Sequence, residues 1–331
     1  SIEYFMKKKR PKFGLLIQGP LFSAGRSGQI GTAVAKNNNS KIIEYDCRSN
    51  IDNIISVYKH LFDEIVISTW SDDQYSDYDP EGALRVNVKD ITPKIYERSI
   101  VRKLGKEHVH SSNNIFRQFY GSYKGMQCFS NSIDYVLKIR TDISVDLESM
   151  VDTLIESEVD DTVYIPYKIP EKMFIPDFYF AGKREILEDF FYSMFKDWRL
   201  FTNNVHKDIF LKYAYVKYFN EIGVSSEAYK SEFFGSPDSR IIFVYMINKV
   251  FKSFDKSIYK DMYWRGSRWN VDYTKKINNF RFNNLLVNDI KLPSNAGLLN
   301  SLLKKNNNKL FDFFRIAVIF FAKFYSRYIP K

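Results

Sequence analysis

The sequence predicts an α/β fold with a mostly parallel sheet flanked by helices. In the first half of the chain, short apolar runs of strand length alternate with stretches of helical periodicity. Three of the apolar runs end in polar or turn-forming residues, at 18–20, 68–70 and 140–142. Because ligands of such sheets bind beyond the carboxyl ends of the strands, these segments mark the expected site. Gln18 and Gly19 are its first two candidate residues.

Strands and helices are expected to alternate along residues 13–166. In chain order they are a strand at 13–17, a helix at 51–62, a strand at 64–69, a helix at 113–129, a strand at 135–139, a helix at 146–158 and a strand at 163–166. Gly, Ser and Asn are frequent at 21–40, which is typical of a loop, and residues 71–100 are polar and irregular.

The pattern changes after about residue 185. Long aromatic-rich stretches with helical periodicity follow, for example at 186–198 and 206–222. We therefore expect an α/β core over 1–185 and a helical, aromatic-rich part over 186–303 that packs on this core.

Residues 304–331 form an expected basic, amphipathic tail. From residue 310 onwards, five polar or charged side chains fall in one narrow helical stripe and the rest of the surface is apolar. The apolar run at 316–322 is far shorter than the roughly 20 residues that cross a bilayer. One interpretation is that residues 310–331 lie on an anionic membrane surface. The other is a terminal helix that packs into the core.

Composition narrows the class of protein without choosing one function. The 331 residues are 45% apolar and 17% aromatic, which supports a large core and argues against disorder over most of the chain. A net charge of +10 attracts phosphate groups, whether of nucleic acid, anionic lipid or a sugar nucleotide. Cys47 and Cys128 are the only cysteines, too few for a disulfide framework, and predict reduced thiols in a cytoplasmic protein.

Several common catalytic motifs are absent from the sequence. No GxGxxG fingerprint and no GxxxxGK[ST] loop occurs, which argues against a dehydrogenase and a P-loop kinase. Neither zinc spacing of cysteines and histidines nor a GxSxG elbow is present.

Asp142 is the residue that most clearly indicates chemistry. It follows the strand expected at 135–139. A carboxylate at a strand end can hold Mg²⁺ or Mn²⁺ and present the ion to a diphosphate, as the DxD motif of GT-A glycosyltransferases does. Here Arg140 stands where that motif has its first acid, and a guanidinium can itself bind phosphate. The competing interpretation is a surface Asp that caps the following helix.

Arg117 is the second candidate for phosphate binding. It lies on the helix expected before the strand that leads to Asp142, from where it could reach a phosphate or a donor sugar. Asn114 and Gln118 would offer amide hydrogen bonds on the same side. The alternative is a solvated helix arginine.

Asp177 is a candidate general base. It lies in the segment IPDFYFAG at 175–182, where Pro, Asp and Gly around aromatics predict a loop beside an acceptor. A carboxylate there can take the proton of an acceptor hydroxyl. A turn-forming Asp is the equally open alternative.

Five segments together resemble a known family. They are LLIQGP at 15–20, EIVISTW at 64–70 with the acids that follow, NNIFRQ at 113–118, YVLKIRTD at 135–142 and IPDFYFAG at 175–182. In order and rough spacing the sequence resembles the WavE lipopolysaccharide-synthesis family of bacterial glycosyltransferases over residues 13–185.

The resemblance implies a GT-A-like, Rossmann-type core that binds a nucleotide sugar. It implies transfer of the sugar, hexosyl or sialyl-type from a CMP-sugar, to a lipid-linked or oligosaccharide acceptor of lipopolysaccharide, O-antigen or capsule. Residues 186–303 would form the acceptor side, and the protein would be peripheral on the cytoplasmic face of the inner membrane. By position, the donor-site candidates are Gln18, Asp72, Arg117, Arg140 and Asp142, with Asp142 as the ligand of Mg²⁺ or Mn²⁺ if the reaction is metal-dependent.

Two other classes of function compete with an enzyme. A nucleic-acid-binding protein would be basic and aromatic, but its basic residues would cluster, whereas here they are spread and no binding module is recognisable. Nucleic acid is therefore not an expected partner. A non-catalytic membrane scaffold of polysaccharide assembly would leave Asp142 and Arg117 without a role.

Overall fold

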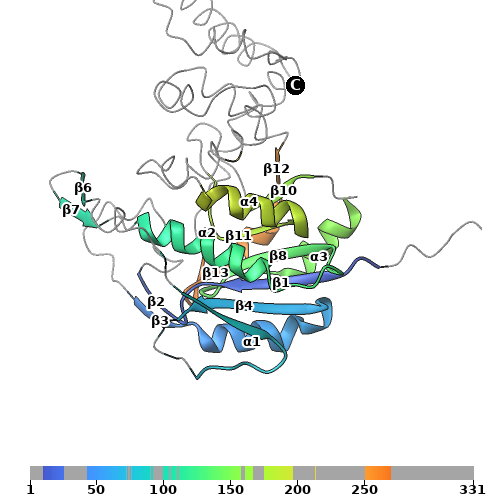
Figure 1. Cartoon of the computed structure of the whole chain (residues 1–331), viewed down its shortest axis with the longest axis horizontal. Coiled ribbons are helices and arrows are strands. Elements are labelled where there is room, and N and C mark those ends of the chain that lie inside the picture. The colour runs from blue at the N-terminus through green and yellow to red at the C-terminus, as the bar shows by residue number, and fades with distance from the viewer. Residues whose placement is uncertain are drawn as a thin grey trace, which may run out of the picture.

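A seven-stranded sheet forms the centre of the molecule, with strand order β12-β10-β11-β8-β1-β4-β5. The computed structural model describes residues 10–25, 43–71, 73, 75, 77–89, 91, 100–103, 106–109, 112–157, 161–166, 175–196, 213 and 250–269. Within these residues the predicted α/β fold with a mostly parallel sheet is confirmed (Figure 1).

The central strands run parallel and end at the same edge of the sheet. β1 (Phe13–Gln18) lies between β4 (Glu64–Trp70) and β8 (Tyr135–Arg140), and β5 (Leu84–Val88) follows at the edge. Gln18 is in register with both Ser68 and Arg140. The carboxyl ends of β1, β4 and β8 therefore meet, as the sequence predicted.

The other half of the sheet includes one antiparallel strand and one strand from late in the chain. β11 (Tyr179–Lys183) runs antiparallel to β8 and to β10 (Val163–Ile165). β12 (Phe251–Ser253) pairs in parallel with β10. The sheet and its core thus extend beyond residues 1–185, into the range that the sequence assigned to the helical part.

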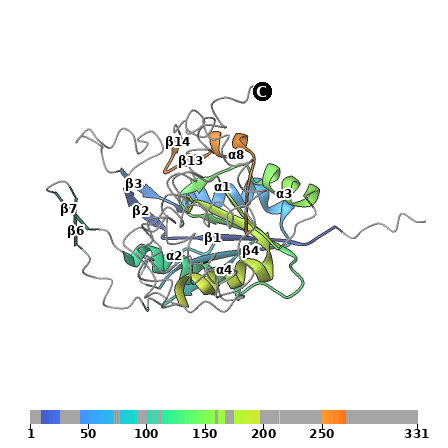
Figure 2. The same cartoon turned by 90° about the horizontal axis from the view of Figure 1, so that it is seen from above.

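Helices cover both faces of the sheet. In Figure 2, α1 (Arg48–Tyr58), α3 (Leu147–Glu156) and α8 (Lys256–Lys260) lie on one face, while α2 (Ser112–Met126) and α4 (Arg184–Lys196) lie on the other. A 3₁₀ turn at Lys59–Leu61 extends α1. The predicted helices at 51–62, 113–129, 146–158 and 186–198 are confirmed to within a few residues at each end. The stretch at 206–222 lies outside the described residues except for Tyr213.

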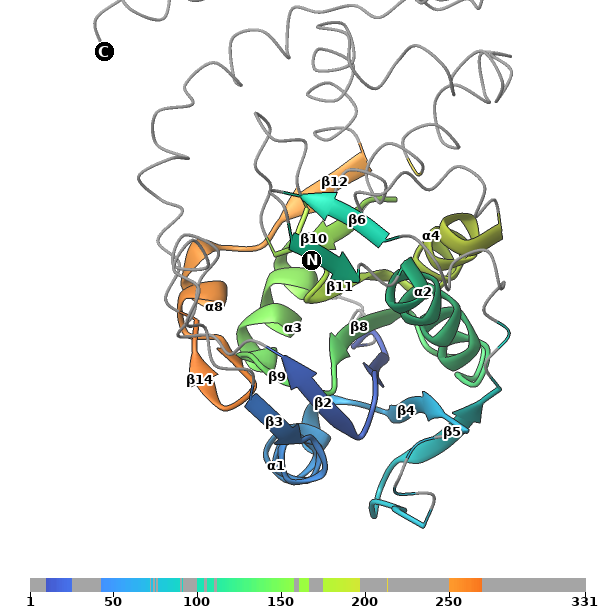
Figure 3. The same ribbon diagram turned by 90° about the vertical axis from the view of Figure 1, so that its left-hand side faces the viewer.

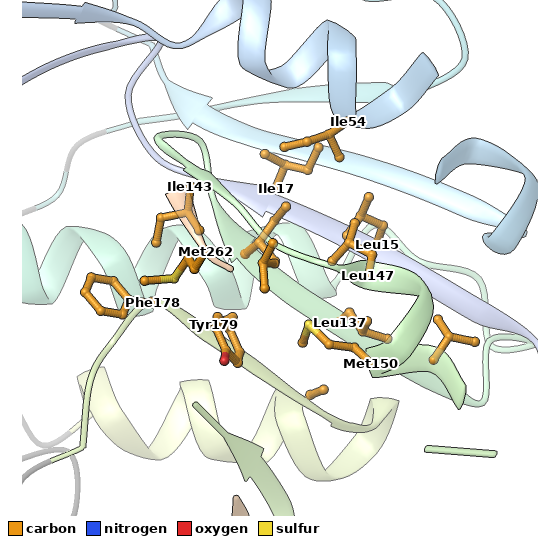
Figure 4. Packing of buried hydrophobic residues seen from close by; sticks show 14 of the residues in the cluster. Leu15, Ile17, Ile54, Leu137, Ile143, Leu147, Met150, Phe178, Tyr179 and Met262 are labelled. Carbon is orange, nitrogen blue, oxygen red and sulfur yellow. The ribbon is translucent and has the colours of Figure 1, made fainter. Parts of the chain in front are cut away.

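The main apolar core lies between the sheet and the face covered by α1 and α3. Alternate residues of the strands point to this face, and they meet apolar side chains of both helices (Figure 4). The labelled contributors include Leu15, Ile17, Leu137, Ile54 and Leu147, all at most 1% exposed. Burying each such side chain stabilises the folded protein by about 1.5–3 kcal/mol. This packing holds the strands, and with them their carboxyl ends, in fixed positions.

Three short pairings surround the sheet. β2 (Phe22–Gly25) pairs with β3 (Ile43–Asp46), which Figure 3 shows beside α1. β9 (Ile143–Ser144) pairs with β13 (Tyr263–Trp264), which forms a hairpin with β14 (Ser267–Arg268). β6 (Ile100–Lys103) pairs with β7 (Lys106–Val109).

Among the strands of the described residues, the sequence predicted β1, β4, β8 and β10 and did not reveal the others. β11 occupies most of the segment 175–182 that was expected to be a loop, so only residues 175–178 there lack strand structure. β2 occupies the beginning of the predicted loop at 21–40, of which residues 26–40 lie outside the described part. β5 lies in the segment expected to be irregular. It is an edge strand with polar side chains at Arg85 and Asn87, so it lacks the continuous apolar run that identified its neighbours.

The tail at 304–331 lies entirely outside the described residues, and its membrane contact stays a prediction. In the part of the chain that the structure describes, no helix is long and apolar enough to span a membrane.

Candidate functional site

The candidate site is the edge of the sheet where β1, β4 and β8 end. The turn after β1 packs directly on the turn after β8. Gly19 has φ +148°, and a Cβ built there would lie 2.5 Å from Thr141 Oγ1. The Thr141 hydroxyl donates to the Pro20 carbonyl at 2.8 Å. Gly19 therefore has a structural reason to be glycine, and its backbone helps to fix the two turns against each other.

Asp142 is the centre of a buried charged cluster at this edge. Its side chain is only 2% exposed. Arg140 donates to it twice, from Nε to Oδ1 at 3.0 Å and from a terminal nitrogen to Oδ2 at 2.9 Å. Oδ2 also accepts from Ser23 Oγ and Trp264 Nε1, each at 3.1 Å, and lies 3.2 Å from Nε of Arg265. Asp142 is therefore the shared partner of two guanidinium groups.

The electrostatics of the cluster keep Asp142 ionised. Burial alone would raise the pKa of Asp142, but Arg140 and Arg265 outweigh burial and hold this pKa below its usual range. The helix-capping interpretation of Asp142 is wrong, because the N-cap of α3 is Asp146, which accepts from the Ser149 backbone N–H at 3.1 Å.

Arg140 connects the two predicted catalytic carboxylates. Besides its bonds to Asp142, it approaches Asp177 Oδ2 at 3.5 Å. Burial would lower the pKa of Arg140, but Asp142 and Asp177 raise it above the ordinary value. Arg140 is thus a permanent cation between two acids. Gln118 of α2 holds the same segment, since its Nε2 donates to the Asp177 carbonyl at 2.8 Å.

The surroundings of Asp142 do not fit the expected role of a Mg²⁺ or Mn²⁺ ligand. Both carboxylate oxygens already accept hydrogen bonds, and the two nearest charged groups are the cations Arg140 and Arg265. A divalent ion would have to displace these donors and sit beside two positive charges. Within the described ranges, moreover, no group of three or more His, Cys, Asp or Glu side chains could hold a metal.

Gln18 and Arg117 lie around the ends of β1 and β4. Gln18 is 3% exposed and packs against Gly121 of α2. A Cβ built on Gly121 would lie 3.1 Å from the Nε2 atom of Gln18. The Arg117 guanidinium lies 5.3 Å from the centroid of the Trp70 ring, within cation–π range. Arg117 therefore contacts the end of β4, which disfavours its interpretation as a purely solvated helix residue.

Two predicted donor-site residues are not placed by the structure. Asp72 lies outside the described residues, and for Asn114 only the backbone, in the first turn of α2, is described. The neighbouring acid Asp73 is placed: its carboxylate accepts from the Leu21 backbone N–H at 2.7 Å and so fixes the turn after β1.

Ser23, Trp264 and Arg265 also belong to the cluster around Asp142, and the sequence did not reveal them. The last two come from the turn of the β13–β14 hairpin, which the pairing of β13 with β9 brings to Asp142. The Arg265 backbone N–H donates to the Asp142 carbonyl at 2.8 Å. Gly266 between the polar residues Arg265 and Ser267 is a turn signal, but nothing in the sequence links that turn to Asp142.

Lys138 is a further ionisable group beneath the cluster. It lies on β8 two residues before Arg140, hence on the same face, and is 0% exposed. Its Nζ finds no hydrogen-bond partner among the described residues and lies 5.6 Å from the Phe180 ring centroid. Burial, helped by Arg140, lowers the pKa of Lys138 to about 7, although Asp177 and Asp142 act in the opposite direction.

A polar cavity lies at the other end of β8. Its volume is about 250 Å³, and it is lined by Asn131, Ile133, Asp134, Tyr135, Lys183, Arg184 and Glu185. It contains none of the predicted site residues and adjoins the beginning of β8. Because parallel sheets bind ligands at their carboxyl ends, the charged cluster is the better candidate site.

Comparisons with known proteins leave the function open. No family model and no curated protein sequence matches this chain. Among solved structures, the chain is similar to 4-diphosphocytidyl-2C-methyl-D-erythritol synthase from Anaerococcus prevotii, with 12% sequence identity and a TM-score of 0.30. The match covers 75% of this chain and 91% of that chain. Similarity at this level is no guide to function.

Proposed function

We propose that this protein is a glycosyltransferase of GT-A-like fold, related to the WavE family. It transfers a sugar from a nucleotide-sugar donor to a lipid-linked or oligosaccharide acceptor of bacterial lipopolysaccharide, O-antigen or capsule. The observation that carries the proposal is the position of Arg140 between Asp142 and Asp177 at the carboxyl edge of a mostly parallel sheet. Cations and a carboxylate in one place match the two needs of sugar transfer, namely a departing phosphate and an attacking hydroxyl.

The donor phosphate is the anion that Arg140 and Arg117 would bind. Arg140 remains charged at all physiological pH values, and its planar guanidinium suits phosphate. Arg117 contacts Trp70, at the end of the strand next to β1. Strand β1 lies between β8, which carries Arg140, and β4, whose Trp70 contacts Arg117. Gln18 and the turn at Gly19, at the end of β1, therefore lie between the two arginines.

Asp177 is the proposed general base. Its carboxylate is held by Arg140, and its backbone carbonyl is held by Gln118. In the transfer step, the bond between the anomeric carbon and the phosphate oxygen breaks and its electron pair stays on that oxygen. The acceptor oxygen bonds to the anomeric carbon, and the acceptor proton passes to Asp177.

The acceptor and the location follow from the family resemblance and from the tail. A lipid-linked acceptor places the reaction at a membrane surface, and residues 310–331 would hold the enzyme on the anionic cytoplasmic face of the inner membrane.

The deciding experiment is a thermal-unfolding screen of the full chain with CMP, UDP, GDP and TDP. We expect one nucleotide to stabilise the protein, by about 2.7 kcal/mol at a concentration of 100 times its Kd. The corresponding nucleotide sugars are then tested for turnover. If no nucleotide stabilises the protein and no donor is consumed, the proposal is wrong and a scaffold role gains support.

Asp177→Asn tests the catalytic assignment within that experiment. We expect it to lower transfer by about 10²–10⁴-fold while nucleotide binding is retained. Asp161→Asn is the matched control, because Asp161 is an exposed acid that pairs with Lys183 near the far end of β8. Full turnover in the Asp177→Asn variant would remove Asp177 from the mechanism.

A further inference from the structure

We propose that Arg265, at the turn of the β13–β14 hairpin, binds the donor phosphates together with Arg140 and supplies the positive charge that a divalent cation supplies in metal-dependent enzymes. This inference rests on the proposed function and adds a residue and a charge-stabilising device to it. Asp142 was expected to bind a metal ion, but two guanidinium groups surround its carboxylate.

The hairpin holds Arg265 at Asp142 through its backbone. β13 pairs antiparallel with β9, with Trp264 opposite Ile143 and Tyr263 opposite Ser144. The next residue, Arg265, donates its backbone N–H to the Asp142 carbonyl. Its guanidinium Nε then donates to Ser23 Oγ at 2.9 Å and lies 3.2 Å from Asp142 Oδ2. Backbone and side chain thus converge on one aspartate.

The backbone conformation of Arg265 indicates that its side chain is needed. Arg265 has φ +47° and Gly266 has φ +73°, so both central residues of this two-residue turn have positive φ. Such turns favour Asn, Asp or Gly at the first position. A non-glycine residue held there costs about 1–3 kcal/mol, and it is tolerated mainly at functional sites. An arginine in this place is unfavourable for the turn alone.

Charge and burial favour an anionic ligand at this place. The Arg265 side chain is 10% exposed and that of Arg140 is 20% exposed, and both guanidiniums face the same carboxylate. Burial lowers the pKa of Arg265, and Arg140 lowers it further against the effect of Asp142. Arg140 and Arg265 repel each other across the shared carboxylate, and Asp177 offsets part of this positive charge on the side of Arg140. A bound phosphate would relieve the remaining repulsion.

Trp264 connects the two guanidiniums. The ring centroid lies 4.8 Å from Cζ of Arg265 and 5.9 Å from Cζ of Arg140, and the ring nitrogen donates to Asp142. One indole therefore positions both cations and the carboxylate. When the donor bond breaks, negative charge develops on the departing phosphate, and fixed guanidiniums stabilise this charge without reorganisation.

The test uses the full chain with Arg265→Ala and Arg265→Lys. The probe is whichever of CMP, UDP, GDP or TDP stabilises the wild type, compared with the nucleoside that lacks its phosphates. Arg268→Ala is the matched control, because Arg268 lies on the same hairpin but is 62% exposed and pairs with Asp261. Circular dichroism establishes that each variant is folded, and Arg265→Lys decides the question if Arg265→Ala does not fold.

We expect Arg265→Ala to weaken nucleotide binding by about 10- to 100-fold, as for the loss of a charge-assisted hydrogen bond. Arg265→Lys should show a smaller loss, because lysine keeps the charge but not the planar fork. Nucleoside binding and the Arg268→Ala variant should match the wild type, and a chelator should leave wild-type transfer unchanged.

Two results overturn the inference while the proposed function stands. One is nucleotide affinity equal to wild type in the folded Arg265 variants, and the other is loss of wild-type transfer on chelation. A wild type that binds none of the four nucleotides and consumes no nucleotide sugar instead overturns the proposed function, and the inference with it.

Discussion

Charged side chains gather near both ends of strand β8, but their surroundings are opposite. At the carboxyl end, Arg140, Asp142 and Arg265 are at most 20% exposed, and both arginines contact Asp142. Near the beginning, Lys183 and Asp161 form an ion pair at 2.8 Å, with side chains 32% and 74% exposed. Exposed pairs contribute about 0–1 kcal/mol, whereas buried charges cost several kcal/mol unless they are fully paired.

The difference indicates that the carboxyl end of β8 is adapted to a function and not to stability. A buried charged cluster is weak evidence for stabilisation, since apolar side chains of similar volume often serve as well or better. Strain at Arg265 adds to the cost at the carboxyl end, as does the buried amine of Lys138, which has no hydrogen-bond partner among the described residues. A sequence usually departs from such rules at functional sites.

Asp142→Asn should produce the largest effect at the buried end. It would leave Arg140 and Arg265 facing a neutral amide, and breaking a buried ion pair in this way costs about 3–5 kcal/mol. We expect the free energy of unfolding, measured by urea denaturation, to fall by that amount and sugar transfer to be lost. A loss of stability below about 1 kcal/mol, typical of an exposed pair, would contradict the contrast between the two ends.

Lys138→Met should stabilise the protein, because it removes a buried amine for which the described part of the chain offers no hydrogen-bond partner. Such a group costs about 1–3 kcal/mol, and we expect a gain of this size at pH 7. Thermal and urea unfolding of the variant and the wild type measure it.

The pH dependence of the same variant has a definite sign. The pKa of Lys138 is about 7 in the folded protein and near its ordinary value of 10.5 in the unfolded chain. Between these values the unfolded chain binds more protons, so this residue makes the wild type more stable as the pH rises. The advantage of Lys138→Met should therefore be largest at or below pH 7 and shrink towards pH 9. An advantage that is constant with pH would show that Lys138 does not titrate in this range.

The position of the candidate site, though not the contrast between the two ends of β8, was predictable from the sequence because its signals are local. The strands around Gln18 and Arg140 were recognisable because each is a short apolar run, and the parallel-sheet rule then placed their ends together. The same rule singled out Asp142. The mutual approach of Arg140 and Asp177 was not predicted, because residues 175–182 were expected to form a loop, whereas residues 179–183 form β11 beside β8.

The features of the site that the sequence did not predict depend on contacts between distant parts of the chain. Trp264 and Arg265 reach Asp142 from more than 120 residues away, through a two-residue pairing of β13 with β9 that has no sequence signature. The identity of the α3 cap was equally open, because Asp142 and Asp146 both precede that helix and only the turn geometry distinguishes them. The full burial of Lys138 depends on helices packed over β8, which a lysine in an apolar run does not reveal.

Gly19→Ala should have an intermediate effect and tests whether the backbone at the carboxyl end of the sheet is as constrained as the charged side chains there. The variant places a methyl group against Thr141 at a residue with φ +148°, and strain of this kind costs about 1–3 kcal/mol. We expect a fall in the melting temperature together with weaker nucleotide binding, because the turn after β1 would move away from the turn after β8. Gly82→Ala is a useful control, since Gly82 also has positive φ, at +85°, but apart from its chain neighbours no described residue has an atom within 4 Å of where a Cβ would lie.

Lys183→Met should have the smallest effect and is the direct counterpart of Lys138→Met. Both lysines lie on neighbouring strands of one sheet, but Lys183 is part of an exposed ion pair. Its loss should change the free energy of unfolding by less than about 1 kcal/mol, and added salt should reduce that change further because exposed pairs are screened. Sugar transfer and nucleotide binding should remain at wild-type levels. If Lys183→Met instead stabilised the protein or shifted its pH dependence as strongly as Lys138→Met, burial would not be what distinguishes the two ends of β8.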